Sequence, residues 1–224
     1  MKKSDDERKK RVLKIIIEKV NGGWKGWSSN PLETLVGTII SQNTNDRNTD
    51  RAMELLRKEI GINLDAILLA PKEKVMECLK PAGLYNIKAP RIIELAKILK
   101  EKIGDPKKLE EMSSEDVRQF LSKIKGIGPK TVDVFLAFSK KEDVIPVDTH
   151  IKRVAKRLGF AAEKDNYFKI RENLEKSVPK GERVKAHFAL ITFGREICNA
   201  RQPKCPTCPV MQYCPSKKIF YPDI

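Results

Sequence analysis

Four of the five cysteines lie close together near the C-terminus, at a spacing that suits metal binding. Four thiolates accommodate either a tetrahedral zinc ion or an iron–sulfur cube. Only one pair forms the short two-residue spacing that is typical of zinc sites, so the spacing modestly favours the cluster and leaves zinc open. The fifth cysteine, Cys78, lies in an apolar helical stretch and is expected to be a small buried residue. The four grouped residues are Cys198, Cys205, Cys208 and Cys214.

Residues 114–138 contain two helical patterns on either side of the tight turn KGIGP. Its glycines reach backbone angles that other residues avoid, and Pro129 can begin the second helix because its missing N–H is not needed there. The N-terminus of that helix favours an anion, and Lys123, Lys125 and Lys130 surround it. An ordinary helical corner is the alternative. The whole pattern favours a helix-hairpin-helix element, which grips the DNA backbone without reading its sequence.

Lys130 and Asp148 are candidates for reactive groups. A nucleophilic lysine must be deprotonated, and neighbouring positive charge at a helix N-terminus lowers its pKa. Asp148 is a carboxylate in the otherwise apolar run IPVDTHI. It can accept a proton or stabilise a developing cation. Taken by itself, however, its position favours an N-cap for the helix that follows.

The charge balance points to an anionic partner. The chain has 224 residues, with 45 Lys and Arg against 30 Asp and Glu, so its net charge is +15. Nucleic acid is the leading partner for such an excess. A Lys/Glu-rich surface of the kind found in heat-adapted proteins is the alternative, and it explains the many charges but not their imbalance.

No apolar run approaches the roughly 18 residues of a membrane span, and no apolar signal core follows the charged first ten residues. We therefore expect a cytoplasmic protein, associated with the nucleoid, whose thiols are kept reduced. The length suits one large domain or two small ones.

The elements that position these residues are expected to be helices, because apolar residues recur at helical spacing along most of the chain. The one short β-like run, at 144–147, is interrupted by Pro146. Residues 21–30 form an expected loop, whose Trp24 and Trp27 would pack over the core. The expected helices are 9–20, 31–40, 46–60, 72–80, 88–103, 114–123, 129–139, 147–158, 166–177 and 183–197.

Together these motifs resemble the endonuclease III family of DNA glycosylases, from about Asn30 to Cys214. The match covers the cysteine spacing, GIGPKT, VDTH, SQNTNDRNTDRA at 41–52 and GLYNIKA at 83–89. The resemblance implies an all-α fold of two interlocked domains. One is a six-helix barrel at 28–139, with the hairpin at about 114–139. The other joins 1–27 to 140–224 and holds a [4Fe-4S] cluster on the four cysteines.

The resemblance further implies a base-excision repair glycosylase with AP lyase activity. It would remove oxidised pyrimidines from damaged double-stranded DNA as a monomer, with Lys130 as the nucleophile and Asp148 as the catalytic carboxylate. Relatives that only remove mismatched bases carry tyrosine or serine at the position of Lys130. A mismatch-specific thymine or uracil glycosylase is the alternative enzyme. A non-enzymatic DNA-binding module with a zinc knuckle and an RNA-binding protein are alternatives from other classes.

The same resemblance implies which residues contact DNA. Gln42 would fill the space left by a flipped nucleotide, and Leu84 would wedge the opposite strand. His150 is expected to be structural or to contact DNA. Two residues depart from the family pattern, since Lys125 replaces a usual proline and Ser122 an acidic residue. The implied DNA-binding set is Gln42, Leu84, Lys125, Gly126, Gly128 and His150, with Arg195, Arg201 and Lys204 as candidates beside the cysteines or as plain solvated charges.

Overall fold

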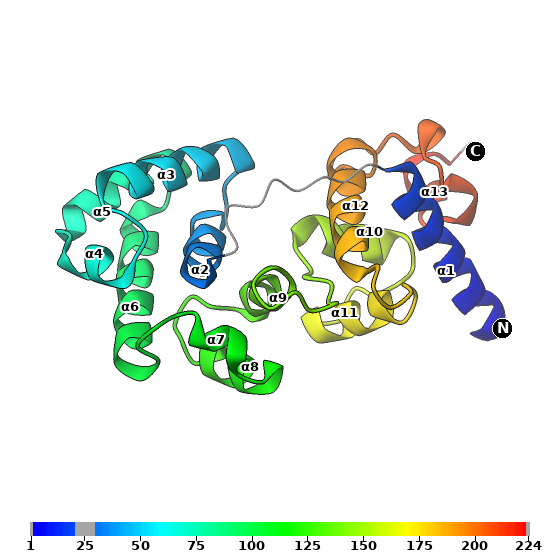
Figure 1. Ribbon diagram of the computed structural model, residues 1–224. Coiled ribbons are helices and arrows are strands. Elements are labelled where there is room, and N and C mark those ends of the chain that lie inside the picture. The colour runs from blue at the N-terminus through cyan, green and yellow to red at the C-terminus, as the bar shows by residue number, and fades with distance from the viewer. Residues whose placement is uncertain (1, 21–29, 223–224) are drawn as a thin grey trace. The chain divides into compact units, whose positions relative to one another are not determined.

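The computed structural model describes residues 2–20 and 30–222, and its regular elements are all helices (Figure 1). Within these residues there is no β-strand, and the run at 144–147 has no regular secondary structure. The all-α prediction is therefore confirmed. Each helix predicted from apolar periodicity is present. Of the predicted loop at 21–30, residues 21–29, with Trp24 and Trp27, lie outside the described residues.

The chain divides into two compact units, one of residues 26–142 and one of residues 1–25 with 143–224. The described helices of the first unit are α2 (Pro31–Ile40), α3 (Asp46–Glu59), α4 (Leu64–Leu69), α5 (Lys72–Leu79), the 3₁₀ helix η1 (Lys80–Ala82), α6 (Tyr85–Lys102), α7 (Lys108–Glu111), α8 (Ser114–Ser122) and α9 (Pro129–Phe138). Those of the second are α1 (Lys2–Lys19), α10 (Thr149–Arg157), α11 (Tyr167–Glu175), α12 (Arg183–Glu196), η2 (Cys205–Thr207), η3 (Met211–Tyr213) and α13 (Lys217–Phe220).

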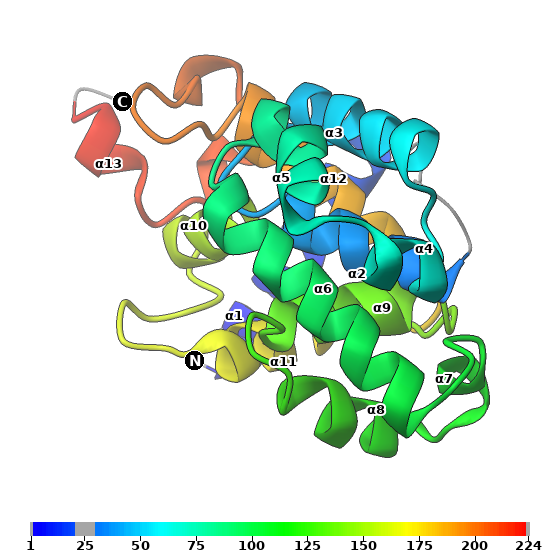
Figure 2. The ribbon, with the colours of Figure 1, turned by 90° about the vertical axis from the view of Figure 1, so that its left-hand side faces the viewer.

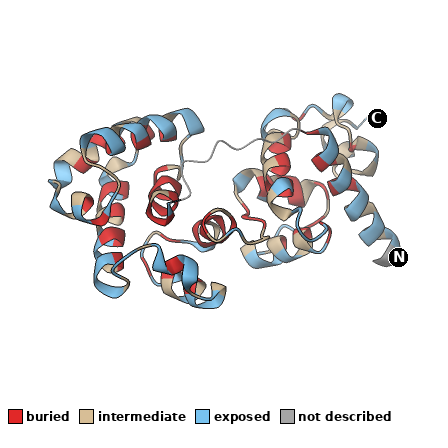
Figure 3. Ribbon diagram, viewed as in Figure 1, coloured by how far each residue is buried: buried red, intermediate tan, exposed pale blue. Residues whose placement is uncertain are grey.

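Two apolar helices, α2 and α9, form the centre of the 26–142 unit. Nine of the ten residues of α2 are buried, and residues 131–137 of α9 are buried as well (Figure 3). The two helices pack against each other, α2 also contacts α3 and α6, and α9 contacts α8. Each buried Val, Leu, Ile or Phe contributes about 1.5–3 kcal/mol of transfer free energy. The core thereby fixes α9, the second helix of the hairpin.

Helix α6 packs against α5, α4 and α2, and it lies in the foreground of Figure 2. Its buried stripe includes Ala89, Ile92, Leu95, Ala96 and Leu99. Pro90 is the sixth residue of the helix, so its missing N–H removes one helical hydrogen bond. The first turn of α6 begins at Tyr85, directly after Gly83 and Leu84, whose backbones both have positive φ.

In the other unit, α12 packs against both α1 and α10, and α10 also contacts α11. Their shared core contains Val12, Leu13 and Ile16 of α1, Ile151 and Val154 of α10, and Leu190 and Phe193 of α12. Three of the grouped cysteines, Cys198, Cys208 and Cys214, pack at the edge of this core. The core therefore holds the cysteine loop, residues 198–214, at several points.

Candidate active site and cysteine loop

The predicted hairpin is present and closes through one tight turn. Gly126 has φ +93°, a backbone angle that favours glycine. The amide of Ile127 donates to the Ile124 carbonyl at 3.0 Å, and the Ile127 side chain is buried. At the other end of the hairpin, the Ser113 hydroxyl accepts from the Asp116 amide and caps α8.

Helix α9 begins at Pro129, with Gly128 as its N-cap in an extended conformation. Glycine has no side chain, so no side-chain bond caps this helix, and the exposed backbone of Gly128 precedes it. Lys130 is the second residue of α9 and is half-buried, whereas Lys123 and Lys125 are exposed in the turn. The hairpin thus brings three lysines to a helix end that already carries partial positive charge.

Gln42 is held between the hairpin and α6. Its side-chain Nε2 donates to the Gly126 carbonyl at 3.1 Å, and its Oε1 accepts from Arg91 Nη1 at 3.1 Å. Arg91 in turn lies against the hairpin, because a methyl group on Gly126 would come within 2.6 Å of Arg91 Cδ. The side-chain amide of Gln42 is therefore oriented by both neighbours.

Leu84 stands at the start of α6 in the left-handed region, with φ 50°. Its side chain is 48% exposed, and that of Ile87, one turn later, is 47% exposed. Two large apolar side chains are thus presented to solvent at the same helix end. The neighbouring Lys88 is the opposite case: its side chain is 1% exposed, and its ammonium donates to the carbonyls of Ile40 and Ala82 at 2.8 and 2.9 Å.

Asp148 is the N-cap of α10. Its Oδ1 accepts from the Ile151 amide at 2.8 Å, and its side chain is half-buried. The capping role that the residue alone favours is therefore present. Two residues on, His150 Nδ1 lies 3.3 Å from Arg153 Nη2, an intrahelical contact that gives the half-buried imidazole a structural role.

A buried ion pair ties the two hairpin helices together. Arg118 of α8 donates from Nη1 to Asp133 Oδ1 of α9 at 2.6 Å, and the Asp133 side chain is fully buried. Breaking such a pair from one side leaves an uncompensated buried charge and costs about 3–5 kcal/mol. Asp133 follows Lys130 by three residues, so this pair lies within one helical turn of the candidate nucleophile.

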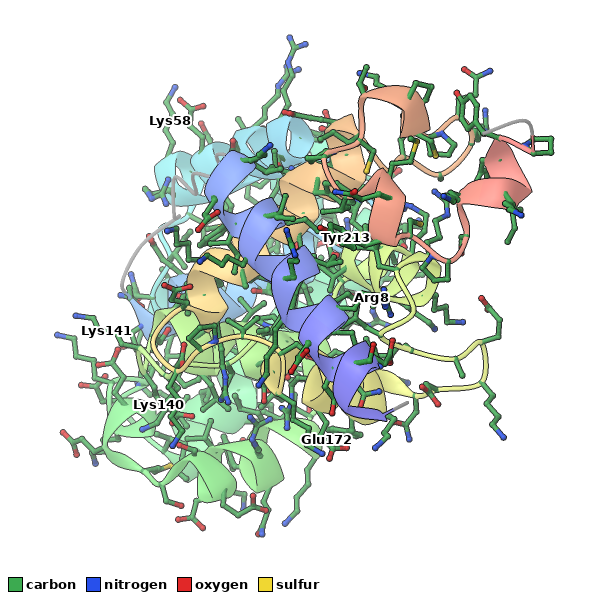
Figure 4. All side chains as sticks on the ribbon, turned by 90° about the vertical axis from the view of Figure 1, so that its right-hand side faces the viewer. Arg8, Lys58, Lys140, Lys141, Glu172 and Tyr213 are labelled. Atoms are coloured by element: carbon green, nitrogen blue, oxygen red, sulfur yellow. The ribbon has the colours of Figure 1, made fainter. Side chains whose placement is uncertain are left out.

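Three arginines frame the cysteine loop. Arg153 donates to the carbonyls of Gly194 and Cys198, and Arg157 donates to those of Asn199 and Ala200. Arg157 Nη1 also lies 3.5 Å from the Cys198 sulfur. Arg8 of α1 donates to the carbonyls of Leu158 and Tyr213 at 3.0 and 2.9 Å; Figure 4 labels Arg8 and Tyr213. These bonds hold both ends of the loop.

The four grouped cysteines are partly buried and influence one another's protonation. The pKa of Cys208 is raised to about 11, chiefly by burial and also by the neighbouring Cys198, Cys214 and Cys205. Burial also raises the pKa of Cys205 and Cys214, with Cys198 again adding to the shift. Within residues 2–20 and 30–222, no three His, Cys, Asp or Glu side chains form a group that could hold a metal ion. The four thiols therefore lie in one loop, but their side chains are not arranged as metal ligands in the part of the chain that the structure describes.

A cavity of about 600 Å³ is lined mainly by residues of the loop between Cys198 and Cys205. Arg201 and Lys204, two of the basic residues expected beside the cysteines, line it together with Asn199, Gln202, Pro203 and Tyr221. Both basic side chains are exposed. The third, Arg195, is exposed near the C-terminal end of α12 and does not line this cavity.

Comparison with known proteins identifies the family. Residues 36–180 match the family model of the HhH-GPD superfamily base excision DNA repair proteins. Endonuclease III of Sulfolobus acidocaldarius is 34% identical over 190 residues, which cover 84% of this chain and 83% of the relative. Endonuclease III of Bacillus subtilis is 34% identical over 186 residues, with 83% and 81% covered. The chain belongs to the endonuclease III family.

The fold comparison agrees with this membership. A solved structure of an endonuclease III trapped as a covalent intermediate with DNA superposes with a TM-score of 0.85 at 28% identity, covering 96% of this chain and 97% of that one. As a member of the endonuclease III family, the chain is a DNA glycosylase of base excision repair. The matched family region contains the hairpin, Lys130 and Asp148, while the cysteine loop follows it.

Among the candidate residues, the structure brings Gln42 and Gly126 into contact and places both on the unit that carries Lys130. Sequence reasoning missed Lys88, Arg91 and the arginines around the cysteine loop. A lysine or arginine in a helix normally lies on a solvated face, and most of the partners of these side chains are tens of residues away along the chain. No helix of the described residues is long and apolar enough to cross a bilayer.

Proposed function

We propose that this endonuclease III family member is a bifunctional glycosylase and AP lyase that removes oxidised pyrimidines from duplex DNA. The observation that carries the proposal is the position of Lys130. It is half-buried in the first turn of α9, next to an uncapped glycine turn in which two further lysines lie. This arrangement suits a lysine that meets a DNA backbone held at a helix N-terminus. A single copy of the chain is proposed to suffice.

In the proposed reaction, the Lys130 amine attacks C1′ of the damaged nucleotide with its lone pair. The C1′–N bond to the base breaks. The base departs with the electron pair of that bond and gains a proton. Opening of the sugar ring gives a Schiff base between Lys130 and C1′. Loss of a proton from C2′ then expels the 3′ phosphate by β-elimination, and water releases the lysine. The positive end of α9 favours the neutral amine that this attack requires.

Asp148 is proposed as the carboxylate that takes up a proton and stabilises the cationic sugar as the base leaves. The support is the VDTH motif match together with the local geometry. One carboxylate oxygen accepts from the Ile151 amide, which holds the side chain in a fixed orientation at the start of α10. A carboxylate has two oxygens, so capping a helix and acting in catalysis are compatible roles.

A duplex conceals C1′, so the damaged nucleotide must leave the base stack before Lys130 can react. We propose that Gln42 occupies the vacated space and that Leu84 wedges the opposite strand. Their support is the exposure of Leu84 and the fixed orientation of the Gln42 amide between Gly126 and Arg91. The backbone of Gly126 and Gly128, together with Lys125, is proposed to contact phosphate.

The cysteine loop is proposed to hold a [4Fe-4S] cluster through Cys198, Cys205, Cys208 and Cys214. The donor set fits, because four thiols from one loop are the ligands that such a cluster takes. When bound, the cluster would supply a rigid cross-link within a segment that has little regular structure. Arg201 and Lys204, which line the adjacent cavity, would then be held for contact with DNA phosphate.

The test is a cleavage panel of duplexes that carry thymine glycol, an oxidised cytosine, uracil, mismatched thymine or an abasic site. The proposal predicts base release from the oxidised pyrimidines and strand cleavage 3′ to the lesion and to the abasic site. Release of mismatched thymine alone, without any lyase product, would instead support a mismatch-specific glycosylase. Binding of every duplex without cleavage would support a non-enzymatic DNA-binding module.

A further inference from the structure

Lys88 is a fully buried cation whose hydrogen bonds both go to main-chain carbonyls. Its side chain is 1% exposed, and Nζ donates to Ile40 O at 2.8 Å and to Ala82 O at 2.9 Å. Ile40 is the last residue of α2, and Ala82 is the last residue of η1. The carbonyls at helix C-termini lack intrahelical partners and carry partial negative charge, so a cation is favoured there.

The two carbonyls occupy equivalent positions relative to the proposed DNA-probing residues. Ile40 precedes Gln42 by two residues, and Ala82 precedes Leu84 by two residues. One ammonium therefore joins the turn that carries Gln42 to the turn that carries Leu84. These turns are 42 residues apart in the sequence, since 84 − 42 = 42.

Two further contacts make α6 the common support of both turns. The amide of Lys88 donates to the Leu84 carbonyl at 2.9 Å, which closes the first turn of α6 behind Leu84. Arg91, three residues after Lys88, donates to the side chain of Gln42 at 3.1 Å. Helix α6 thus reaches residue 42 through Arg91 and residue 40 through Lys88.

We propose that Lys88 is a positioning residue that fixes the spacing between Gln42 and Leu84, so that both can enter the duplex together. The inference rests on the proposed function, because it takes Gln42 and Leu84 as the inserting side chains. Lys88 itself touches neither DNA nor the reacting atoms. It acts by holding the two backbone turns at one distance, which an apolar side chain of similar length cannot do.

The test replaces Lys88 by methionine, which keeps the length and removes the donor, and compares it with Leu99→Ala. Leu99 is fully buried on the same helix, three turns farther along, so this control weakens the core without touching either turn. Insertion is read from the fluorescence of 2-aminopurine placed opposite a tetrahydrofuran abasic analogue in a duplex. The analogue cannot form a Schiff base, so the signal does not depend on Lys130 chemistry.

We expect Lys88→Met to slow the fluorescence rise roughly 10- to 100-fold, since displacement of a positioning group by about 1 Å has effects of that size. Borohydride trapping on single-stranded abasic DNA, where no partner strand must be displaced, is expected to change less than about threefold. Leu99→Ala is expected to lower the melting temperature about as much as Lys88→Met lowers it. The rate of insertion by Leu99→Ala is expected to stay near that of the wild type.

Equal effects of Lys88→Met and Leu99→Ala on insertion would overturn the inference, as would a wild-type protein that gives no fluorescence rise. A wild type that raises the fluorescence but never traps on abasic DNA would refute the lyase function and leave the positioning result standing. Should Lys88→Met fail to fold, Lys88→Gln takes its place with the same expected slowing of insertion, because its shorter side chain cannot reach both carbonyls.

Discussion

The side-chain amide of Gln42 donates to the main-chain carbonyl of Gly126, joining the turn after α2 to the turn of the hairpin. Arg91 holds the other end of the same amide. A residue proposed to probe DNA is thus bonded to the loop proposed to grip it. Because the bond reaches the backbone of the hairpin, a change in the conformation of residue 126 is transmitted directly to Gln42.

Gly126→Ala is predicted to disturb this connection. Gly126 has φ +93°, and the new methyl carbon would lie 2.6 Å from Arg91 Cδ, so Arg91 must move away from Gln42. We expect a loss of about 1–2 kcal/mol in the free energy of unfolding from the left-handed backbone alone. Chemical denaturation measures it. Gly128→Ala is the matched control, because Gly128 has φ −94° and nothing lies within 4 Å of the added carbon. Equal destabilisation by the two substitutions would contradict the explanation.

Two substitutions of Asp148 can separate its role as a helix cap from its proposed role in catalysis. Asparagine caps helices as well as aspartate, so Asp148→Asn is expected to change the free energy of unfolding by less than about 0.5 kcal/mol, whereas Asp148→Ala loses about 1 kcal/mol. Both variants are expected to slow base release by about 10²–10⁴-fold, because neither has a carboxylate. Single-turnover base release and denaturant unfolding provide the two readouts. Normal base release by Asp148→Asn would show that Asp148 serves only as a helix cap.

The four grouped cysteines are predicted to be distinguishable from Cys78 by metal content. Protein purified without oxygen should be brown and contain iron, and Cys208→Ser should lose both the broad visible absorption and the iron. Cys78→Ser is the control, because Cys78 is buried in α5 among apolar residues of the other unit. A colourless protein that contains zinc would refute the cluster.

Lys88 also predicts a pH dependence of stability. Burial lowers the pKa of Lys88 below 10.5, its ordinary value. Between the lowered pKa and 10.5 the unfolded chain binds more protons at this site than the folded chain, so stability rises with pH in that window. The unfolding free energy of the wild type minus that of Lys88→Met should therefore increase as the pH approaches 10.5. Denaturant titrations of both proteins across that range test the sign, and a difference that falls with pH would contradict the lowered pKa of Lys88.

The sequence predicted the hairpin well because its determinants are local. Gly126 needs its positive φ, Pro129 begins α9, and Ile127 is buried, all within five residues. The beginning of α1 was less predictable. Periodicity indicates residue 9, because the first turns of α1 carry no apolar stripe. The helix nevertheless begins at Lys2, and its first turns are held by the ion pairs of Asp5 and by the hydrogen bonds of Arg8.

Short helices and long-range contacts account for what the sequence did not reveal. The six residues of α4, Leu64–Leu69, are too short for a periodic pattern, although Asn63 caps them through the Ala66 amide. Lys88 resembles any solvated helical lysine until Ile40, 48 residues earlier, supplies its partner. Roles that depend on such distant partners emerge only when the helices are packed.

Borohydride trapping on an abasic duplex tests the central claim most directly, since reduction fixes the Schiff base as a permanent covalent link. The wild type and Lys125→Ala, which removes a neighbouring lysine of the same turn, are predicted to form the protein–DNA adduct. Lys130→Ala is predicted to form none while still binding the duplex. An adduct from Lys130→Ala, or none from the wild type, would contradict the assignment of Lys130 as the nucleophile.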